Sequence, residues 1–151
     1  MAGFLVDTNV LVYAYDQTDG SKRSQATEVL RIVGRNGTGV LSTQVLSEFF
    51  VTVTRKIPTP LSHFEAAEKI TRYIESWIVC YITTFVVSEA IRGVSAHQLP
   101  YYDALVWATA RLNQVSNIVT EDGRHGRLIE GVRYLNPFHP QFDLSAIEPA
   151  T

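Results

Sequence analysis

Short runs of apolar residues alternate with longer segments in which apolar residues recur at helical spacing, and this alternation restricts the fold most. A strand that is apolar at consecutive positions is buried on both faces, which is typical of a parallel sheet covered by helices on each side. We therefore predict an α/β fold with a parallel central sheet. The expected strands are residues 4–6, 39–41, 77–82, 117–119 and 132–135, and the expected helices are residues 9–15, 21–33, 43–53, 62–75, 86–96 and 103–112.

The chain is long enough for one domain with a sizeable core. Its 151 residues are 46% apolar and 19% charged, which is a globular and not a disordered composition. A net charge of −2 gives no overall basic field, so nucleic-acid binding requires a local basic patch. We expect one domain over residues 1–138 and a tail over residues 139–151 that packs on the domain or extends from it.

Cysteine content and the apolar runs indicate the compartment. The single cysteine, Cys80, lies within an apolar run, which favours a buried thiol in a reducing compartment. The N-terminal apolar run lacks a preceding basic segment and is interrupted by Asp7, unlike a signal peptide. No apolar run approaches the ~20 residues of a membrane-spanning helix. These features predict a cytoplasmic protein.

Four acidic residues are placed differently from the other acids of the chain. Asp7 directly follows the first expected strand, and Asp122 follows the fourth by three residues. The carboxyl ends of parallel strands form the ligand-binding edge of such a sheet, so these two side chains are expected at one edge. Asp103 opens an apolar helix whose start lies near that edge, and Glu48 lies one turn into the helix after the second strand. We therefore predict that the four carboxylates share one cleft.

Each of these acids also has a purely structural explanation. An aspartate at a helix start, such as Asp7 or Asp103, is commonly an N-cap, Asp122 suits a turn, and Glu48 suits a solvated helix border. Convergence favours a shared role, because carboxylates at one edge repel one another and require compensation. Mg²⁺ or Mn²⁺ with oxygen ligands is the usual compensation. No positive side chain is an obvious substitute, since the only lysines are Lys22, Lys56 and Lys69.

Other catalytic motifs are absent from the sequence. The four histidines show no metal-ligand spacing, and one cysteine cannot build a zinc site. No G-x-G-x-x-G segment, Walker lysine loop or G-x-S-x-G nucleophile motif occurs. The acidic residues are therefore the chemical signal that remains.

Four segments together resemble the PIN domain family, and most closely the VapC-type toxins of VapBC toxin–antitoxin systems. They are LVDTNVL at 5–11, STQVLSEF at 42–49, YDAL at 102–105 with two alanines after it, and VTED at 119–122. The ending LNPF at 135–138 is similar too. Together these segments span nearly the whole chain in the order that the family has.

The resemblance implies a compact three-layer α/β/α domain whose central sheet has five, mostly parallel strands. It also implies a metal-dependent endoribonuclease, with Mg²⁺ or Mn²⁺ held by Asp7, Glu48, Asp103 and Asp122. Asn9 and Thr120 match the polar positions that accompany these acids. An RNA substrate, a cognate antitoxin protein and a homodimer follow from the same resemblance.

Basic and aromatic residues near these segments are candidates for RNA contacts. Where the family often continues with an apolar residue after the fourth acid, this chain has GRHGR at 123–127. Arginines and lysines there and at the end of the third helix could contact backbone phosphates, and solvated surface is the alternative. These residues are Arg124, Arg127, Arg55 and Lys56. Tyr101 and Tyr102 either stack on bases or pack in the core or at the rim of the domain.

Two alternative functions belong to other classes. A phosphoacceptor signalling domain also gathers acids at the strand ends of a parallel sheet, but it requires a lysine near a late strand, and no lysine follows Lys69. A PIN-like module that binds RNA or a partner without cleavage is the other alternative, which a nuclease assay with metal and with EDTA distinguishes.

Overall fold

The structure is a computed structural model, and it describes residues 2–149. Within that range six strands form one sheet in the order β3-β2-β1-β4-β6-β5. All neighbouring strands are parallel except β5 and β6. The mostly parallel α/β fold is therefore confirmed. The strands are β1 Phe4–Val6, β2 Gly39–Ser42, β3 Ile78–Cys80, β4 Asn117–Val119, β5 Leu128–Ile129 and β6 Val132–Leu135.

The sixth strand is the difference from the five that the resemblance implied. β5 has two residues and pairs antiparallel with β6 across a two-residue turn. Both turn residues, Glu130 and Gly131, have positive φ angles of 47° and 85°, as a tight type I′-like hairpin requires. So short a strand produces no apolar run, and for this reason the sequence pattern did not predict it.

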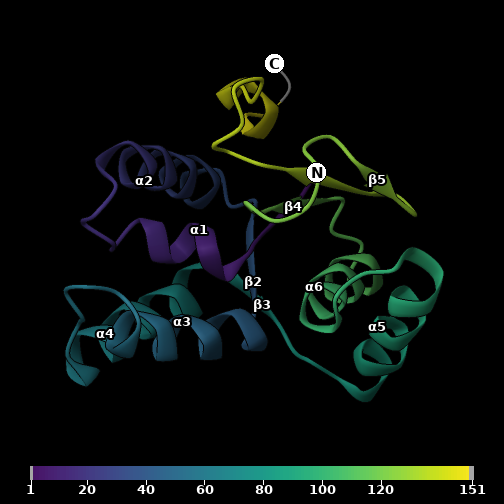
Figure 1. The fold of residues 1–151 in the computed structure, drawn as a ribbon, viewed down its shortest axis with the longest axis horizontal. Coiled ribbons are helices and arrows are strands. Elements are labelled where there is room, and N and C mark those ends of the chain that lie inside the picture. The colour runs from purple at the N-terminus through teal and green to yellow at the C-terminus, as the bar shows by residue number, and fades with distance from the viewer. Residues whose placement is uncertain (1, 150–151) are drawn as a thin grey trace.

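Six α-helices within residues 2–149 cover the two faces of the sheet (Figure 1). In this view α1 to α4 lie on one side, and α5 and α6 lie on the other. Each predicted helix is present, with shifts at its ends. The helices are α1 Thr8–Tyr13, α2 Gly20–Arg35, α3 Thr43–Arg55, α4 His63–Ser76, α5 Thr84–His97 and α6 Tyr101–Leu112.

Two hydrophobic clusters fill the spaces between the layers. Successive strand residues point to opposite faces, so Phe4 and Val6 of β1 join the cluster under α1 to α4, and Leu5 joins the other. Trp107 on α6 is the largest side chain of the second cluster and is 0% exposed. Both faces of the sheet are therefore dry, which explains why its strands are apolar at consecutive positions.

Side-chain caps fix where several helices begin. Ser42 accepts a hydrogen bond from the Val45 N–H at the start of α3, and Ser62 forms a capping box with Glu65 at α4. The N-cap of α1 is Asp7, which lies before the expected helix start at residue 9. The helix begins one residue earlier than expected because the aspartate directly after the strand serves as its cap.

Part of the expected C-terminal tail packs against α2. A 3₁₀ helix, η1, spans Leu144–Ile147, and Ile147 is 1% exposed within the first cluster. Arg35 at the end of α2 forms a salt bridge with Glu148. Residues 150 and 151 of the expected tail lie outside the described residues.

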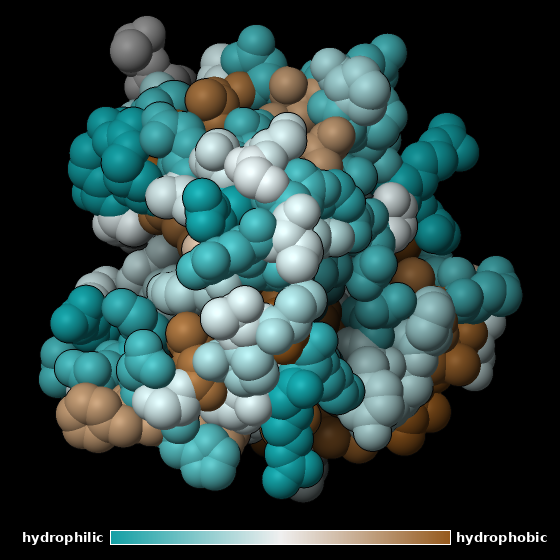
Figure 2. Space-filling view, turned by 60° about the vertical axis from the view of Figure 1, so that its left-hand side comes forward, coloured by the Kyte–Doolittle hydropathy of each residue, from teal (hydrophilic) through white to brown (hydrophobic). Residues whose placement is uncertain are grey.

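The surface is mixed in character. Hydrophilic residues cover most of the face in Figure 2, and hydrophobic residues gather mainly at its lower right edge. None of the helices within residues 2–149 is long and apolar enough to cross a membrane.

Close contact between α5 and α6 depends on the absence of a side chain at Gly93. The Trp107 ring lies over this residue, and a Cβ added there would be 2.7 Å from ring atom Cζ3. The ring cannot move away easily, because it is fully buried and its Nε1–H donates to the Ile129 carbonyl at 3.3 Å. The two helices can therefore approach only where glycine faces the indole.

We expect Gly93→Ala to destabilise the protein by about 1–3 kcal/mol, because the overpacked core must shift. The direction of the change in stability is informative, because alanine is about 1 kcal/mol more favourable than glycine in a helix interior where space is available. Gly20→Ala is the matched control, because an added Cβ at the start of α2 meets nothing within 4 Å. Urea unfolding of the three proteins measures both effects. Equal stability of the two variants would show that Trp107 accommodates the methyl group.

Candidate active site

Three acidic side chains meet at the carboxyl ends of β1 and β4. These strands pair in register from Phe4 with Asn117 to Val6 with Val119, so both end at the same level. Asp7 follows β1, Asp122 lies in the segment after β4, and Asp103 comes from the first turn of α6. One carboxylate oxygen of each lies within 4.8 Å of the others.

Asp7 is held by hydrogen bonds to both carboxylate oxygens. Its Oδ1 accepts from the Thr8 N–H at 2.8 Å, and its Oδ2 accepts from the Thr120 hydroxyl at 2.8 Å. The side chain is also 9% exposed, so it has little freedom. Asp7 therefore caps α1 and belongs to the acidic group at the same time, although the sequence presented these as alternatives.

Asn9 and Thr120 contact two of the three acids. The Thr120 hydroxyl, besides donating to Asp7, accepts from Asn9 Nδ2 at 3.2 Å and from the Asp122 N–H at 3.0 Å. Asn9 Nδ2 also lies 3.2 Å from Asp122 Oδ2, and its Oδ1 accepts from the Glu121 N–H at 3.2 Å. These contacts fix the segment after β4 against α1 and orient Asp122.

Asp103 is not the N-cap of α6. The cap position is Pro100, with no side-chain hydrogen bond, and Asp103 lies three residues further along. None of the hydrogen bonds found within the described range involves its carboxylate. The structural explanation that the sequence offered for this half-buried acid therefore does not apply.

Glu48 lies apart from the group of three. It is an exposed residue of α3, and its carboxylate accepts from Gln44 Nε2 at 2.7 Å. Gln44 also donates to the Tyr102 carbonyl at 3.1 Å, which joins α3 to the start of α6. Glu48 lines the same hollow as Asp7, Asp103 and Asp122 but does not approach them to ligand distance.

Two hollows adjoin the three carboxylates. The larger, of about 400 Å³, includes Glu48, Lys56 and Tyr102, and the smaller, of about 220 Å³, includes Arg127. Of the four predicted phosphate contacts, Lys56 and Arg127 thus lie beside the acids. Arg55 and Arg124 are exposed and line neither hollow. Tyr102 is 67% exposed with its ring edge against Tyr101, so neither tyrosine is a core residue.

Burial and mutual repulsion raise the pKa values of the acids. Burial raises the pKa of Asp7 to about 6, against the hydrogen bonds from Thr120 and Thr8, and the charges of Asp122 and Asp103 raise it further. The pKa of Asp103 is also raised, first by burial and then by Asp122 and Glu48. The three acids therefore place negative charge in a partly buried environment.

Within residues 2–149, the three carboxylates of Asp7, Asp103 and Asp122 form no ion pair with a basic side chain. Three converging carboxylate oxygens are the donor set that hard divalent cations prefer. Thr8, which also lines the larger hollow, has a buried Oγ1 with no hydrogen-bond partner in the described part of the chain. These residues fit a bound Mg²⁺ or Mn²⁺.

Sequence reasoning missed two groups that support the site. Gln44 positions Glu48, and its spacing of four residues on a helix was a usable signal. Glu121 forms a salt bridge with Lys22 and accepts from the Tyr13 hydroxyl at 2.8 Å, so it braces α1 and α2 against the segment after β4. The contacts of Glu121 join segments that are far apart in the chain, so no local sequence pattern indicates them.

Comparison with known proteins identifies the fold independently. The PIN domain family model matches residues 4–130. A toxin–antitoxin complex from Klebsiella pneumoniae is similar at 18% identity with a TM-score of 0.66, covering 91% of this chain and 98% of that chain. DNA-bound VapBC from Salmonella typhimurium is similar at 18% identity with a TM-score of 0.62, covering 89% and 97%.

A third similar structure is VapC20 of Mycobacterium tuberculosis, described as a sarcin-ricin loop cleaving toxin. It has 17% identity and a TM-score of 0.60, and the match covers 77% of this chain and 87% of that chain. None of the curated protein sequences matches. At these identities the likeness shows a shared fold.

The raised pKa of Asp7 predicts how stability depends on pH in EDTA. Because the pKa is about 6 in the folded protein and about 3.9 in an unfolded chain, folding favours the protonated form. The resulting stability is fully present below pH ~4 and is lost as pH rises through 6. Relative to Asp7→Asn, the parent protein should lose about 2 kcal/mol between pH 4 and pH 7.

Asp7→Asn is the matched reference because the other acids titrate in both proteins. The asparagine amide faces a Thr120 oxygen that already accepts two hydrogen bonds, so a constant loss of stability is expected at every pH. Only the pH-dependent difference reports the ionisation of Asp7. Parallel stability curves for the two proteins in urea between pH 4 and pH 7 would contradict the raised pKa.

Proposed function

The chain belongs to the PIN domain family, and from that premise we propose that it is a metal-dependent endoribonuclease that hydrolyses phosphodiester bonds of RNA. The observation that carries the proposal is that Asp7, Asp103 and Asp122 converge to within 4.8 Å and form no salt bridge with any basic residue among residues 2–149. These acids come from three separate segments. Repulsion between them would be selected against in a purely structural site.

We assign the ligand role to Asp7, Asp103 and Asp122, with Glu48 completing the site from the α3 side of the hollow. When bound, Mg²⁺ or Mn²⁺ supplies Lewis acidity toward the phosphate and acidifies water. Asn9 and Thr120 keep Asp7 and Asp122 in place, since they donate to the carboxylates or accept from the adjoining backbone. This preorganisation reduces the rearrangement needed when substrate binds.

The basic residues beside the acids suit the RNA backbone. Lys56 lines the larger hollow and Arg127 lines the smaller one, so they lie on two walls around the carboxylates. We propose that both contact phosphates near the scissile bond, and that Arg55 and Arg124 contact the strand further out. In the reaction, water forms a bond to phosphorus, the bond to one ester oxygen breaks, and that oxygen leaves with a proton. The protein is expected to act in the cytoplasm, where RNA is available.

We expect cleavage of single-stranded or loop RNA in Mg²⁺ or Mn²⁺ and none in EDTA. Asp7→Asn, Asp103→Asn and Asp122→Asn should each lower the rate by more than about 100-fold, since losing even an outer partner of a metal site costs 10–100-fold. Glu68→Gln on the exposed face of α4 is the control and should cleave at the parental rate. Gel analysis of labelled RNA measures the rates.

Melting curves separate loss of the metal from loss of the fold. Mn²⁺ should raise the melting temperature of the parent protein, because binding to the native state adds to its stability. In Asp103→Asn the melting temperature in EDTA should rise as repulsion is relieved, and the increase caused by Mn²⁺ should shrink. Full cleavage in EDTA would disprove metal-dependent hydrolysis. Metal binding without cleavage of any RNA would instead favour a non-cleaving PIN-like module.

We further propose that the protein is the toxin of a toxin–antitoxin pair, bound by a cognate antitoxin protein and acting as a homodimer. The support is the likeness to the Klebsiella toxin–antitoxin complex and to the Salmonella VapBC complex, with 98% and 97% of those chains covered, and to the toxin VapC20, with 87% of its chain covered. The resemblance of the four sequence segments points the same way. The antitoxin would be encoded beside this gene.

Expression of the parent protein should arrest bacterial growth, and expression of Asp7→Asn should not, because the variant is expected to lose cleavage but keep its fold. Coexpression of the neighbouring small gene should restore growth and yield a complex that copurifies. Growth curves and size-exclusion chromatography provide the measurements. Equal growth with the parent and the variant would count against the toxin role while leaving the nuclease proposal intact.

A further inference from the structure

The smaller hollow beside the acids is lined mainly by apolar groups. It shares Asp7, Asp103, Asp122 and Val106 with the larger hollow, but its other walls are different. Those walls come from the segment after α5, from β4, from the loop before β5 and from β6: Leu99, Pro100, Ile118, Gly123, Arg127 and Tyr134. Its volume of about 220 Å³ suits a planar ring better than a sugar–phosphate strand.

We propose that this cavity binds the base of a nucleotide adjoining the scissile phosphate and selects, through Arg127 and Tyr134, bases with a carbonyl at C6 of a purine or C4 of a pyrimidine, which are guanine and uracil. The proposal rests on the proposed ribonuclease function and deepens it. The occupant is identified by its chemistry, as a flat ring with hydrogen-bond acceptors on one edge.

The Tyr134 hydroxyl is the first observation that points to an occupant. Tyr134 is 7% exposed, and its hydroxyl is buried without a hydrogen-bond partner in the part of the chain that the structure describes. Buried polar groups nearly always have a partner, because leaving one unpaired costs stability. Burial raises the pKa of Tyr134 to about 12, so the hydroxyl keeps its proton at neutral pH and can donate.

The backbone of Arg127 is paired with the backbone of this tyrosine. The Arg127 carbonyl accepts from the Tyr134 N–H at 2.9 Å, and the Gly126 N–H donates to the Tyr134 carbonyl at 2.8 Å. The Tyr134 ring packs on Gly123, where φ is +83° and an added Cβ would lie 3.3 Å from the ring. None of the salt bridges found within residues 2–149 includes Arg127, so its guanidinium is available to a ligand.

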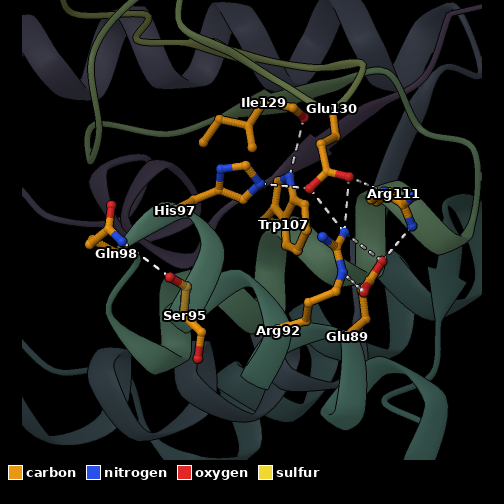
Figure 3. Close-up of polar contacts among 9 residues, drawn as sticks. All are labelled: Glu89, Arg92, Ser95, His97, Gln98, Trp107, Arg111, Ile129 and Glu130. Carbon is orange, nitrogen blue, oxygen red and sulfur yellow. Dashed lines mark hydrogen bonds and ion pairs between the residues drawn. The ribbon is translucent and has the colours of Figure 1, made fainter.

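The opposite wall is held by a polar network, shown in Figure 3. Glu130 in the β5–β6 turn contacts His97 at 2.6 Å and Arg92 at 2.9 Å, both on α5. Trp107 Nε1 donates to the Ile129 carbonyl beside that turn. These contacts tie the end of α5 to the hairpin that carries Tyr134, so the turn leading to Leu99 and Pro100 is preformed.

The polar groups of the cavity determine which base edge fits. The three carboxylates are assigned to the metal, the Thr120 hydroxyl donates to Asp7, and the Gln98 amide donates to the Ser95 carbonyl. Of the remaining groups, the Arg127 guanidinium only donates hydrogen bonds, and the partnerless Tyr134 hydroxyl can donate as well. Guanine presents O6 and N7 acceptors to such donors, and uracil presents a carbonyl. Adenine and cytosine place an amino group at the corresponding position, which would face the guanidinium donors. The apolar walls contribute stacking and exclusion of water regardless of the base.

Matched nucleosides test this inference without any cleavage. In EDTA, methyl NMR signals of Leu99, Val106 and Ile118 should shift when inosine or uridine is added to the parent protein. Adenosine and cytidine differ from these by an amino group in place of the carbonyl, and we expect them to bind at least about three-fold more weakly. Phosphate-free probes avoid repulsion by the acids.

Two variants remove the proposed donors. Tyr134→Phe keeps the ring and loses the hydroxyl, and Arg127→Gln loses the guanidinium. Each should reduce the preference for inosine over adenosine by about three- to ten-fold. The controls are Tyr81→Phe and Arg72→Gln, which change side chains remote from the cavity and should retain the preference.

Two results would overturn the inference: no methyl shifts at millimolar nucleoside, or equal shifts for carbonyl and amino nucleosides in the parent and in Tyr134→Phe. Failure of the ribonuclease proposal is a separate outcome, because nucleoside binding is measured without RNA. If the protein does cleave RNA, sequencing of the product ends should show a carbonyl base beside the cut and a broader distribution for Tyr134→Phe. An unchanged distribution would count against the assignment.

Discussion

The hydrogen bond from the Thr120 hydroxyl to Asp7 connects the ends of two neighbouring strands, and the geometry of the site depends on it. Because the same oxygen accepts from Asn9 and from the Asp122 N–H, one hydroxyl orients groups from three segments. This arrangement requires β1 and β4 to end in register, which the parallel pairing provides. The acids therefore meet as a consequence of sheet topology, and small local bonds then fix their oxygens.

The acidic group opposes folding in the absence of a cation. Burial, and to a lesser degree the charges of Asp122 and Asp103, disfavour the ionised form of Asp7. Asp103 has neither a cap role nor a hydrogen bond within the described residues to compensate for its position. The two dry clusters on the faces of the sheet provide the stability that tolerates this cost. Such a local conflict between charge and burial is typical of a site kept for function.

The sequence predicted features that depend on local patterning. Apolar runs predicted five strands, and the ends of these strands predicted which acids would share an edge. The sequence could not show that Asp7 is both the N-cap of α1 and a member of the acidic group, because the two roles use different oxygens of one carboxylate. Nor could it predict that Glu48 stands apart, since its rotamer depends on Gln44 and on the Tyr102 carbonyl from another helix. The cavity beside Tyr134 depends on segments far apart in the chain and has no sequence signature.

The two functions inferred for this edge of the sheet rest on different parts of the fold. Asp7 and Asp122 are fixed mainly by β1, β4 and α1, whereas Asp103 lies on α6, which also contributes Val106 to the smaller cavity. The walls formed by Leu99, Pro100 and Tyr134 are supported by contacts between α5, Trp107 and the β5–β6 hairpin. Within residues 2–149, Val106 and the three acids are the residues that adjoin both hollows. Base preference can therefore change through α5 and the β5–β6 hairpin while the three carboxylates stay in place, which would let one nuclease scaffold recognise different RNA sequences.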